Sequence, residues 1–139
     1  MGKYRKQHLT LTGIFGATAV IVGAFGAHAL KPHLSEYGLD IYQTGVAYHF
    51  YHSLAIGIAS LCYSLYKNVW LHRAVLMFAI GILFFSGSLY LLALKDIMNL
   101  EIAGIIGPLT PIGGVFFIGG WIMIVMGGYS AGRLKGHNN

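Results

Sequence analysis

The 139-residue sequence has few charged residues, and four long stretches have none at all. Charged residues make up 9% of the chain, against about 25% in an average soluble domain. The stretches without Asp, Glu, Lys or Arg are residues 9–30, 41–66, 74–94 and 102–132. Each is long enough to cross a bilayer, because a helix needs about 20 residues to span a hydrocarbon core of about 30 Å. These absences argue against a soluble domain and predict an integral membrane protein.

Cysteine and clustered charge are also scarce. Because Cys62 is the only cysteine, it cannot form an intrachain disulfide, and we interpret it as a small buried apolar residue. The net charge of +5 is spread over the ends of the apolar stretches, whereas nucleic-acid-binding proteins gather basic residues on one face. We therefore expect no nucleic-acid partner and take the lipid bilayer as the main surroundings of the chain.

The apolar sequence predicts an all-α fold, an integral membrane four-helix bundle that forms one domain over residues 1–139. The first apolar run follows basic residues and ends near Ala27-His28-Ala29, as in a secretory signal. It is longer than the apolar region of about 7–15 residues in such a signal, so we interpret it as a retained span. The four predicted spans are residues 9–30, 44–66, 72–94 and 105–128.

The charges predict the orientation of the bundle. Seven basic residues lie on one side of the predicted spans: Lys3, Arg5, Lys6, Lys67, Arg73, Arg133 and Lys135. Two basic residues and all four acids lie on the other side: Lys31, Lys95, Glu36, Asp40, Asp96 and Glu101. Because the cytoplasmic loops of membrane proteins are rich in Lys and Arg, we expect both termini in the cytoplasm.

A short interfacial helix is predicted between the first two spans. Pro32 ends the first span, because proline disfavours a helical conformation in the residue before it. Ser35 is a suitable N-cap for the helix that follows. Residues 36–43 mix apolar and acidic positions, so we expect them to lie along the outer membrane surface, either as a separate helix or continuous with the second span.

Small residues mark the faces on which the helices are expected to pack. Gly23 lies in a stripe with Ala19 and Ala27, and the fourth span carries glycines at a spacing of seven. Helices in lipid associate by close backbone approach through small residues, and a spacing of seven keeps residues on one face of a supercoiled helix. The predicted helix-packing residues are Gly23, Gly113, Gly114, Gly120 and Gly127.

The polar residues of the four spans fall at one depth. With a rise of about 1.5 Å per residue, they all lie in the outer half of the membrane, while the inner halves are almost purely apolar. Polar groups in lipid are costly and normally point into the bundle, so we expect one internal cluster that is also the candidate ligand-binding site. Its members are His28, Tyr48, His49, His52, Ser86, Ser88, Tyr90 and Thr110.

Several interpretations of this cluster stay open. The structural one is that the side chains hydrogen-bond to one another and fix the register of the helices. The alternative is a ligand-, haem- or metal-binding module. The cluster would then be a polar pocket for a small molecule, lipid headgroup or quinone, or a haem or metal site, since His49 and His52 are one turn apart and His28 offers a third imidazole, a common metal ligand. Transport is a further alternative, although histidine is the only ionisable group in the spans that such a function would use.

Catalysis is not expected, because no acid at this depth can orient a histidine as in a catalytic triad. We therefore predict no catalytic residue, no resident metal and no cofactor. The remaining histidines are expected to be solvated at span ends or in the tails. They are His8, His33, His72 and His137.

Four motifs in chain order carry a family resemblance. They are Gly-Ala-Phe-Gly-Ala-His-Ala-Leu at 23–30, Tyr-His-Phe-Tyr-His-Ser-Leu-Ala at 48–55, Ser-Gly-Ser-Leu-Tyr at 86–90, and Pro-Ile-Gly-Gly at 111–114 followed by Gly120-Trp121. Together they resemble domain-of-unknown-function family 423, also called uncharacterised protein family 0382, whose animal relative is transmembrane protein 256. The resemblance covers residues 10–128.

This resemblance implies a four-helix, multi-pass protein of the bacterial plasma (inner) membrane without an established activity. It also implies positions to test first: His28, Tyr48, His52, Ser86, Ser88, Tyr90, Pro111 and Gly114. The leading hypothesis is a non-enzymatic structural or accessory component, which acts alone, as a homo-oligomer or within a larger membrane protein complex. It rests on glycine-rich helix faces and on the absence of charge within the spans.

Overall fold

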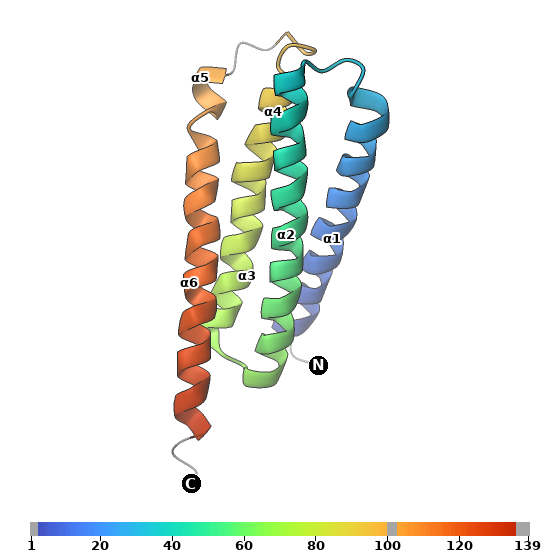
Figure 1. Ribbon diagram of the computed structural model, residues 1–139. Helices are drawn as coiled ribbons and strands as arrows, with labels where there is room; N and C mark the ends of the chain where they lie inside the picture. The colour runs from blue at the N-terminus through green and yellow to red at the C-terminus, as the bar shows by residue number, and fades with distance from the viewer. Residues whose placement is uncertain (1–2, 100–102, 136–139) are drawn as a thin grey trace.

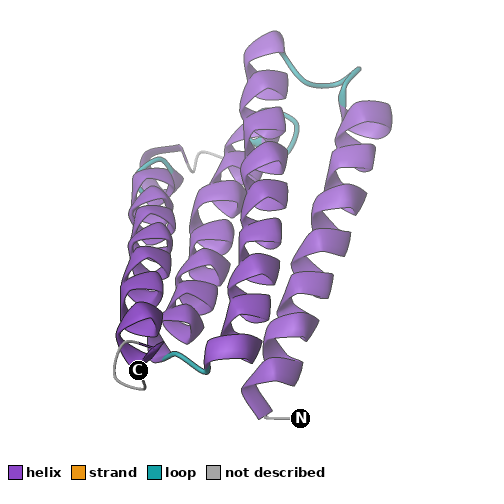
Figure 2. Ribbon diagram, turned by 60° about the horizontal axis from the view of Figure 1, so that its bottom comes forward, coloured by secondary structure: helices purple, strands orange, loops and turns teal. Residues whose placement is uncertain are grey.

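The computed structural model describes residues 3–99 and 103–135, and every regular element in these ranges is a helix (Figure 2). Two of the elements are π-helical turns, named η1 and η2, which continue the helices before them. The elements are α1 (Lys3–Phe25), η1 (Gly26–Leu30), α2 (Glu36–Tyr66), α3 (Val69–Gly81), η2 (Ile82–Ser86), α4 (Gly87–Leu94), α5 (Ala103–Ile106) and α6 (Leu109–Lys135). The all-α fold class is confirmed.

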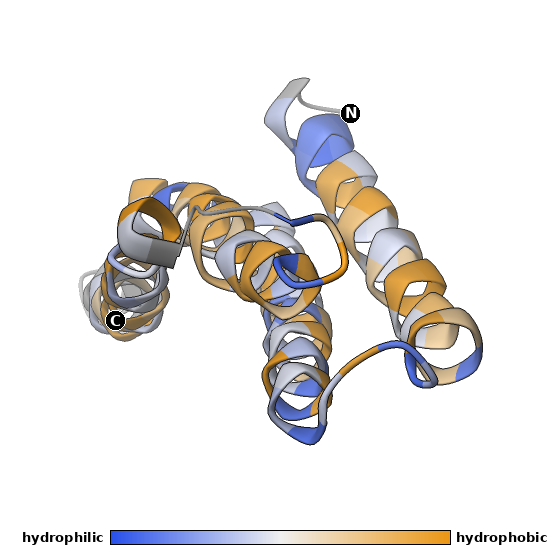
Figure 3. Cartoon of the chain, turned by 90° about the horizontal axis from the view of Figure 1, so that it is seen from above, coloured by the Kyte–Doolittle hydropathy of each residue, from blue (hydrophilic) through white to orange (hydrophobic). Residues whose placement is uncertain are grey.

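These elements form four long rods that lie side by side in chain order (Figures 1 and 3). The first rod is α1 with η1, the second is α2, the third is α3 with η2 and α4, and the fourth is α6. The first rod packs on the second, the second on the third, and the third on α6. Over the described part of the chain α1 makes no contact with α6, so the row is open and not closed into a ring.

Neighbouring rods run in opposite directions, which gives the row two chemically different ends (Figure 1). The start of α1, the α2–α3 turn and the end of α6 lie together at one end, named here the basic end because it carries Lys6, Lys67 and Arg73. The α1–α2 connection and the end of α4 lie at the opposite end. Two rods therefore start, and two end, at the basic end.

Three of the rods are long and apolar enough to cross a membrane: Tyr4–Leu30, Val69–Leu94 and Gly104–Ser130. With 31 residues, α2 is long enough but is not among them, because it carries two histidines and several tyrosines. It lies in the middle of the row, in contact with both the first and the third rods. The most polar rod is therefore one of the two inner rods, each of which has a neighbour on both sides.

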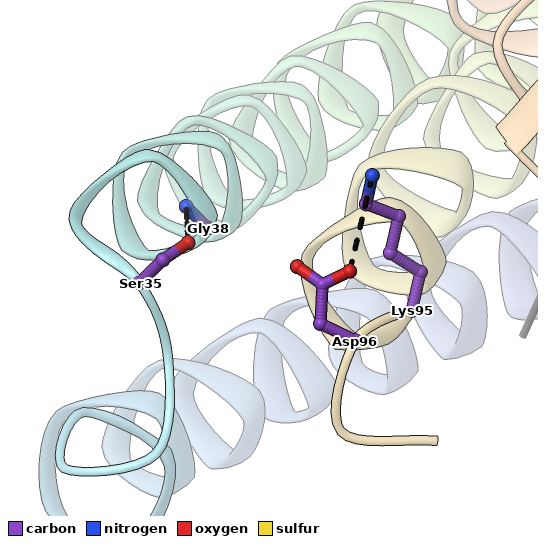
Figure 4. A network of polar contacts seen from close by, with 4 residues as sticks. All are labelled: Ser35, Gly38, Lys95 and Asp96. Atoms are coloured by element: carbon purple, nitrogen blue, oxygen red, sulfur yellow. Dashed lines mark hydrogen bonds and ion pairs between the residues drawn. The ribbon is translucent and has the colours of Figure 1, made fainter. Parts of the chain in front are cut away.

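The second rod begins as the sequence predicts. The Ser35 hydroxyl accepts a hydrogen bond from the Gly38 backbone N–H at 3.1 Å (Figure 4). From Glu36 the helix continues to Tyr66 without a break. A separate interfacial helix over residues 36–43 is therefore wrong, and the alternative of one continuous helix is confirmed. The reason is that no proline occurs between Glu36 and Tyr66, so nothing interrupts the hydrogen-bond ladder.

The same end of the row carries an ion pair between Lys95 and Asp96, whose side-chain N and O atoms are 3.9 Å apart (Figure 4). The Lys95 and Asp96 side chains are 37% and 75% exposed, so the pair contributes at most about 1 kcal/mol. At the basic end, Lys67 ends α2 in the left-handed conformation with a φ of 48°. Asn68 then caps α3 by accepting from the Trp70 N–H at 2.9 Å.

The apolar core lies between α2, the third rod and α6. Ile56, Val75 and Phe78 have no exposed surface, and Phe117 of α6 packs against them. Cys62, expected in the interior, is only half-buried. The core therefore belongs to three rods, and the first rod lies against its edge.

Candidate functional site

His49, in the middle of α2, links three rods. Its Nε2 lies 3.3 Å from the Thr18 hydroxyl in α1, and its Nδ1 lies 3.1 Å from the Tyr90 hydroxyl in α4. The residue is 6% exposed. The Thr18 hydroxyl donates its hydrogen to the Ile14 carbonyl oxygen at 2.8 Å, so it accepts from His49 Nε2–H, and Nδ1 of the neutral imidazole accepts from the Tyr90 hydroxyl. This arrangement satisfies a buried polar side chain entirely from within the chain.

His52, one turn further along α2, lies in an aromatic box. Its Nδ1 is 2.8 Å from the Tyr48 carbonyl oxygen. A carbonyl only accepts, so Nδ1 carries the hydrogen and Nε2 of the neutral ring has a free lone pair. The ring stacks on Phe117 with centroids 3.5 Å apart, and Phe78 and Trp121 lie at 5.5 and 6.3 Å. No residue in the described ranges hydrogen-bonds to Nε2.

Two hydroxyl groups tie α4 to the first turn of α6. The Ser88 and Thr110 hydroxyl oxygens are 2.7 Å apart, and Ser88 also lies 2.8 Å from the Phe85 carbonyl oxygen. Because Ser88 has one hydroxyl hydrogen and donates it to that carbonyl, Thr110 is the donor to Ser88. Ser86, nearby in η2, has no exposed surface, and its hydroxyl has no partner among the described residues.

The other predicted cluster members lie apart. His28, in η1, is exposed and makes no hydrogen bond within the described ranges. The Tyr48 side chain is 41% exposed, and its ring stacks on Phe85 with centroids 4.7 Å apart. Similar depth therefore brings only some of these side chains together, because in an open row the others face different neighbours.

The eight predicted residues consequently divide into separate groups. One group joins His49 to Tyr90, and a second joins Ser88 to Thr110. His52 is bonded to the backbone of its own helix, and Ser86, Tyr48 and His28 stand outside both networks. Sequence reasoning missed Thr18 of α1. Nothing in the sequence shows that its hydroxyl lies within hydrogen-bond distance of His49.

Glycines line the contact between α6 and the third rod. A Cβ at Gly113 would overlap the backbone of Phe85, and a Cβ at Gly120 would lie 2.5 Å from the Phe78 ring. At Gly127 it would lie 2.9 Å from the Leu71 side chain. Backbone and buried rings thus occupy the space that side chains at these positions would need.

The two other predicted packing glycines are less crowded. A Cβ at Gly114 would make an ordinary contact, 3.9 Å from the Phe85 ring, and one at Gly23 would lie 3.1 Å from Val46 of α2. Sequence reasoning missed Gly81, where a Cβ would overlap the ring of Phe117, and Gly26, where it would overlap that of Tyr42. Each of these glycines faces an aromatic ring of another helix, and the sequence alone does not show which ring faces which glycine.

A second polar group lies at the basic end, and it corrects the prediction that His8 is solvated. His8 is 1% exposed, and its Nε2 lies 2.8 Å from Nδ1 of His72 in α3. The Tyr4 ring centroid is 4.7 Å from that of His72, and the Tyr63 centroid is 4.9 Å from that of His8. Because α1 already begins at Lys3, His8 is part of this helix, and its side chain packs against residues of α2 and α3.

The other span-end histidines differ in their surroundings. His33 is exposed, as predicted, and His72 is half-buried by the contact with His8. His137 lies outside the described residues. Over those residues, no three His, Cys, Asp or Glu side chains come close enough to hold a metal ion together.

Comparison with known families identifies the family of the chain. The family described as "Protein of unknown function (DUF423)" matches residues 22–114. The chain belongs to the DUF423 family. This confirms the resemblance inferred from the four motifs, two of which contain His49, His52 and Ser88.

Curated relatives of this DUF423 protein cover most of its length. A UPF0382 membrane protein of Staphylococcus saprophyticus is 45% identical over 125 residues, which is 88% of this chain and 96% of the relative. The UPF0382 membrane protein YwdK of Bacillus subtilis is 40% identical over 87% of this chain and 94% of its own. The UPF0382 inner membrane protein YgdD of Escherichia coli is 35% identical over 91% and 90%. No solved structure matches the chain.

These relatives and the three apolar rods confirm the predicted localisation, a multi-pass protein of the bacterial plasma membrane. The relatives' names give a membrane location and no reaction. The function is therefore to be argued from the side chains described above.

Proposed function

We propose that this DUF423 protein is a non-enzymatic structural or accessory component of the plasma membrane that assembles with a second copy or within a larger membrane complex. The observation that carries the proposal is His49. Hydroxyl groups of neighbouring rods occupy both of its ring nitrogens. Such bonds contribute about 0.6 kcal/mol each in membrane proteins. Because both nitrogens are already bonded within the chain, this arrangement favours a structural role, in which His49 fixes how the helices pack. It does not favour a role in binding a substrate.

The open row supports assembly with another protein. The first rod and α6 each pack mainly on one neighbour within the chain. Their outer surfaces carry large exposed apolar side chains: Val20, Ile21 and Phe25 on α1, and Ile118, Ile122 and Val125 on α6. Helices in lipid associate by close approach through small residues, and among the described residues no atom of another helix lies within 4 Å of a Cβ at Gly13 or Gly16 on α1 or at Gly128 on α6.

The proposed topology is four spans with both termini in the cytoplasm. It is supported by the antiparallel course of the rods and by the basic residues at the end where α1 starts and α6 finishes (Figure 1). Thiol labelling of intact cells tests it: in a Cys62→Ser background, a cysteine at Glu36 is expected to react with an impermeant reagent. A cysteine at Lys67 is expected to react only after lysis, and the reverse pattern would overturn this orientation.

Assembly is tested by extraction in a mild detergent followed by mass determination. The expected result is a stable species larger than one chain, and a uniform monomer would contradict the proposal. Disulfide crosslinking in membranes then locates the contact. In the Cys62→Ser background, Ile122→Cys on α6 or Ile21→Cys on α1 is expected to crosslink, with Ile58→Cys on the exposed surface of α2 as the matched control.

One observation favours a second candidate function, a ligand-, haem- or metal-binding module. The free Nε2 lone pair of His52, with Nδ1 fixed by a carbonyl, is the arrangement found in imidazole ligands. An absorption spectrum and elemental analysis of purified protein test it, with His52→Gln as the variant and His33→Gln as the control. A colourless, metal-free sample from native membranes would exclude haem and metal.

A further inference from the structure

A cavity at the basic end takes no part in the function proposed above. It has a volume of about 460 Å³ and lies between α1 and α3. Its polar wall includes Lys6, Gln7, His8 and His72, and its apolar wall includes Leu11 and Leu76. The cavity therefore offers hydrogen-bonding groups and an apolar surface side by side, which suits an amphipathic ligand.

The histidine pair in this wall has unused hydrogen-bonding capacity. One hydrogen is shared between His8 Nε2 and His72 Nδ1, which are 2.8 Å apart. Whichever ring donates it, the two outer nitrogens of the neutral pair are then one donor and one acceptor. Of these two, His8 Nδ1 is buried without a partner among the described residues, so Nε2 of the half-buried His72 is the outer nitrogen that a ligand in the cavity can reach.

The basic residues around the cavity favour a negatively charged ligand. Lys6 is exposed at its edge, and Arg5 and Arg73 lie at the same end. Glu36, Asp40 and Asp96, the acids within the described ranges, lie toward the opposite end of the row (Figure 1). A basic site at the end of membrane-spanning helices lies at the level of lipid headgroups, where Lys and Arg attract anionic lipids.

We propose that this cavity binds an anionic phospholipid. The phosphate lies between the Lys6 ammonium group and the histidine pair, and an acyl chain follows Leu11 and Leu76 between α1 and α3. When His8 Nε2–H donates to His72 Nδ1, the one hydrogen of the neutral His72 ring is on Nε2, which donates it to the phosphate. This proposal requires neither the oligomer nor the orientation proposed above.

The test is native mass spectrometry of the full chain titrated with phosphatidylglycerol or phosphatidylcholine. Phosphatidylglycerol is expected to bind at least tenfold more tightly. Lys6→Gln is expected to weaken its binding about fivefold, since one cation near a headgroup is worth about 1 kcal/mol. Arg5→Gln removes the same charge one residue away from the cavity and is expected to change binding less than twofold.

Three outcomes would overturn the proposal. Equal binding of the two lipids would remove the anionic preference, and equal losses in Lys6→Gln and Arg5→Gln would show general surface attraction. Displacement of phosphatidylglycerol by millimolar inorganic phosphate would indicate a site for the free anion. His72→Gln, expected to weaken lipid binding as Lys6→Gln does, is compared at equal helix content by circular dichroism. A monomer that still binds the lipid would refute the proposed assembly and leave this inference intact.

Discussion

The two outer rods are attached to the row by different chemistry. The first rod is joined to α2 by hydrogen bonds within the interface. Thr18 meets His49 at 3.3 Å, and the Tyr42 hydroxyl donates to the Val22 carbonyl at 2.8 Å. That carbonyl belongs to the last turn of α1, four residues before Gly26, where η1 begins.

The contact between the third rod and α6 is mostly without polar groups. Its central part consists of glycine backbone against Phe78 and Phe85. The hydrogen bonds across it lie near its two ends, where Asn68 donates to the Gly127 carbonyl at 3.2 Å and Thr110 meets Ser88 at 2.7 Å.

This difference separates two ways to hold helices in lipid, where no hydrophobic driving force acts between them. A glycine interface depends on space, so added atoms damage it. A polar interface depends on paired groups, so removed atoms damage it. Substitutions that add atoms should therefore destabilise the glycine interface more, and substitutions that remove hydrogen-bonding groups should destabilise the polar interface more.

The largest effect is expected from Gly113→Ala. Its Cβ overlaps the Phe85 backbone, which cannot move away as a side chain would. We expect a loss of about 3 kcal/mol in the free energy of unfolding, the upper range for overpacking, measured by SDS titration in mixed micelles. Gly114→Ala is the matched control and should lose less than about 0.5 kcal/mol. Equal stability of the two variants would show that the glycine stripe is not what limits this interface.

The next effect is expected from His49→Leu, which removes two hydrogen bonds from the polar interface. At about 0.6 kcal/mol per bond, the same titration should show a loss of about 1 kcal/mol. Tyr90→Phe removes one of the two bonds and should lose about half as much. A His49→Leu variant as stable as the parent would mean that the first rod is held by packing alone.

A smaller loss, about 0.6 kcal/mol, is expected from Tyr42→Phe. This change keeps the ring that fills the space beside Gly26 and removes only the bond to Val22. Hydrogen exchange of the backbone amides in η1 should rise as well. Unchanged exchange there would indicate that the π-helical turn does not need the hydroxyl.

The smallest effect is expected from Gly128→Ala on α6. No atom lies within 4 Å of the added Cβ, so the change in unfolding free energy should stay within about 0.5 kcal/mol. Thermal unfolding of this variant beside Gly127→Ala, one residue earlier, sharpens the comparison. A large loss in Gly128→Ala would reveal a contact that a single chain does not make.

Much of the fold could be predicted from local chemistry. Charge-free runs give the rods, Pro32 ends the first, and Ser35 caps the second. These features depend on residues close together in the sequence, so they can be read without knowing the partners of each helix.

The candidate site was less predictable because it depends on partners distant in sequence. Of the residues placed at one depth, His49 lies within hydrogen-bond distance of Tyr90, and Ser88 within that of Thr110. Helix depth could not show that η2 adds a residue to one turn of the third rod, which rotates everything after it relative to a regular helix. The depth of a residue along its helix also could not predict the burial of His8, because it depends on contact with His72, 64 positions further along the chain.

The side-by-side order of the rods has a consequence for biosynthesis. Each rod after the first packs on the one made just before it, so a nascent rod meets one of its neighbours as it emerges. The least apolar rod, α2, follows α1 directly, and the His49–Thr18 contact joins two residues from the first half of the chain. The rods are therefore synthesised in the order in which they lie side by side.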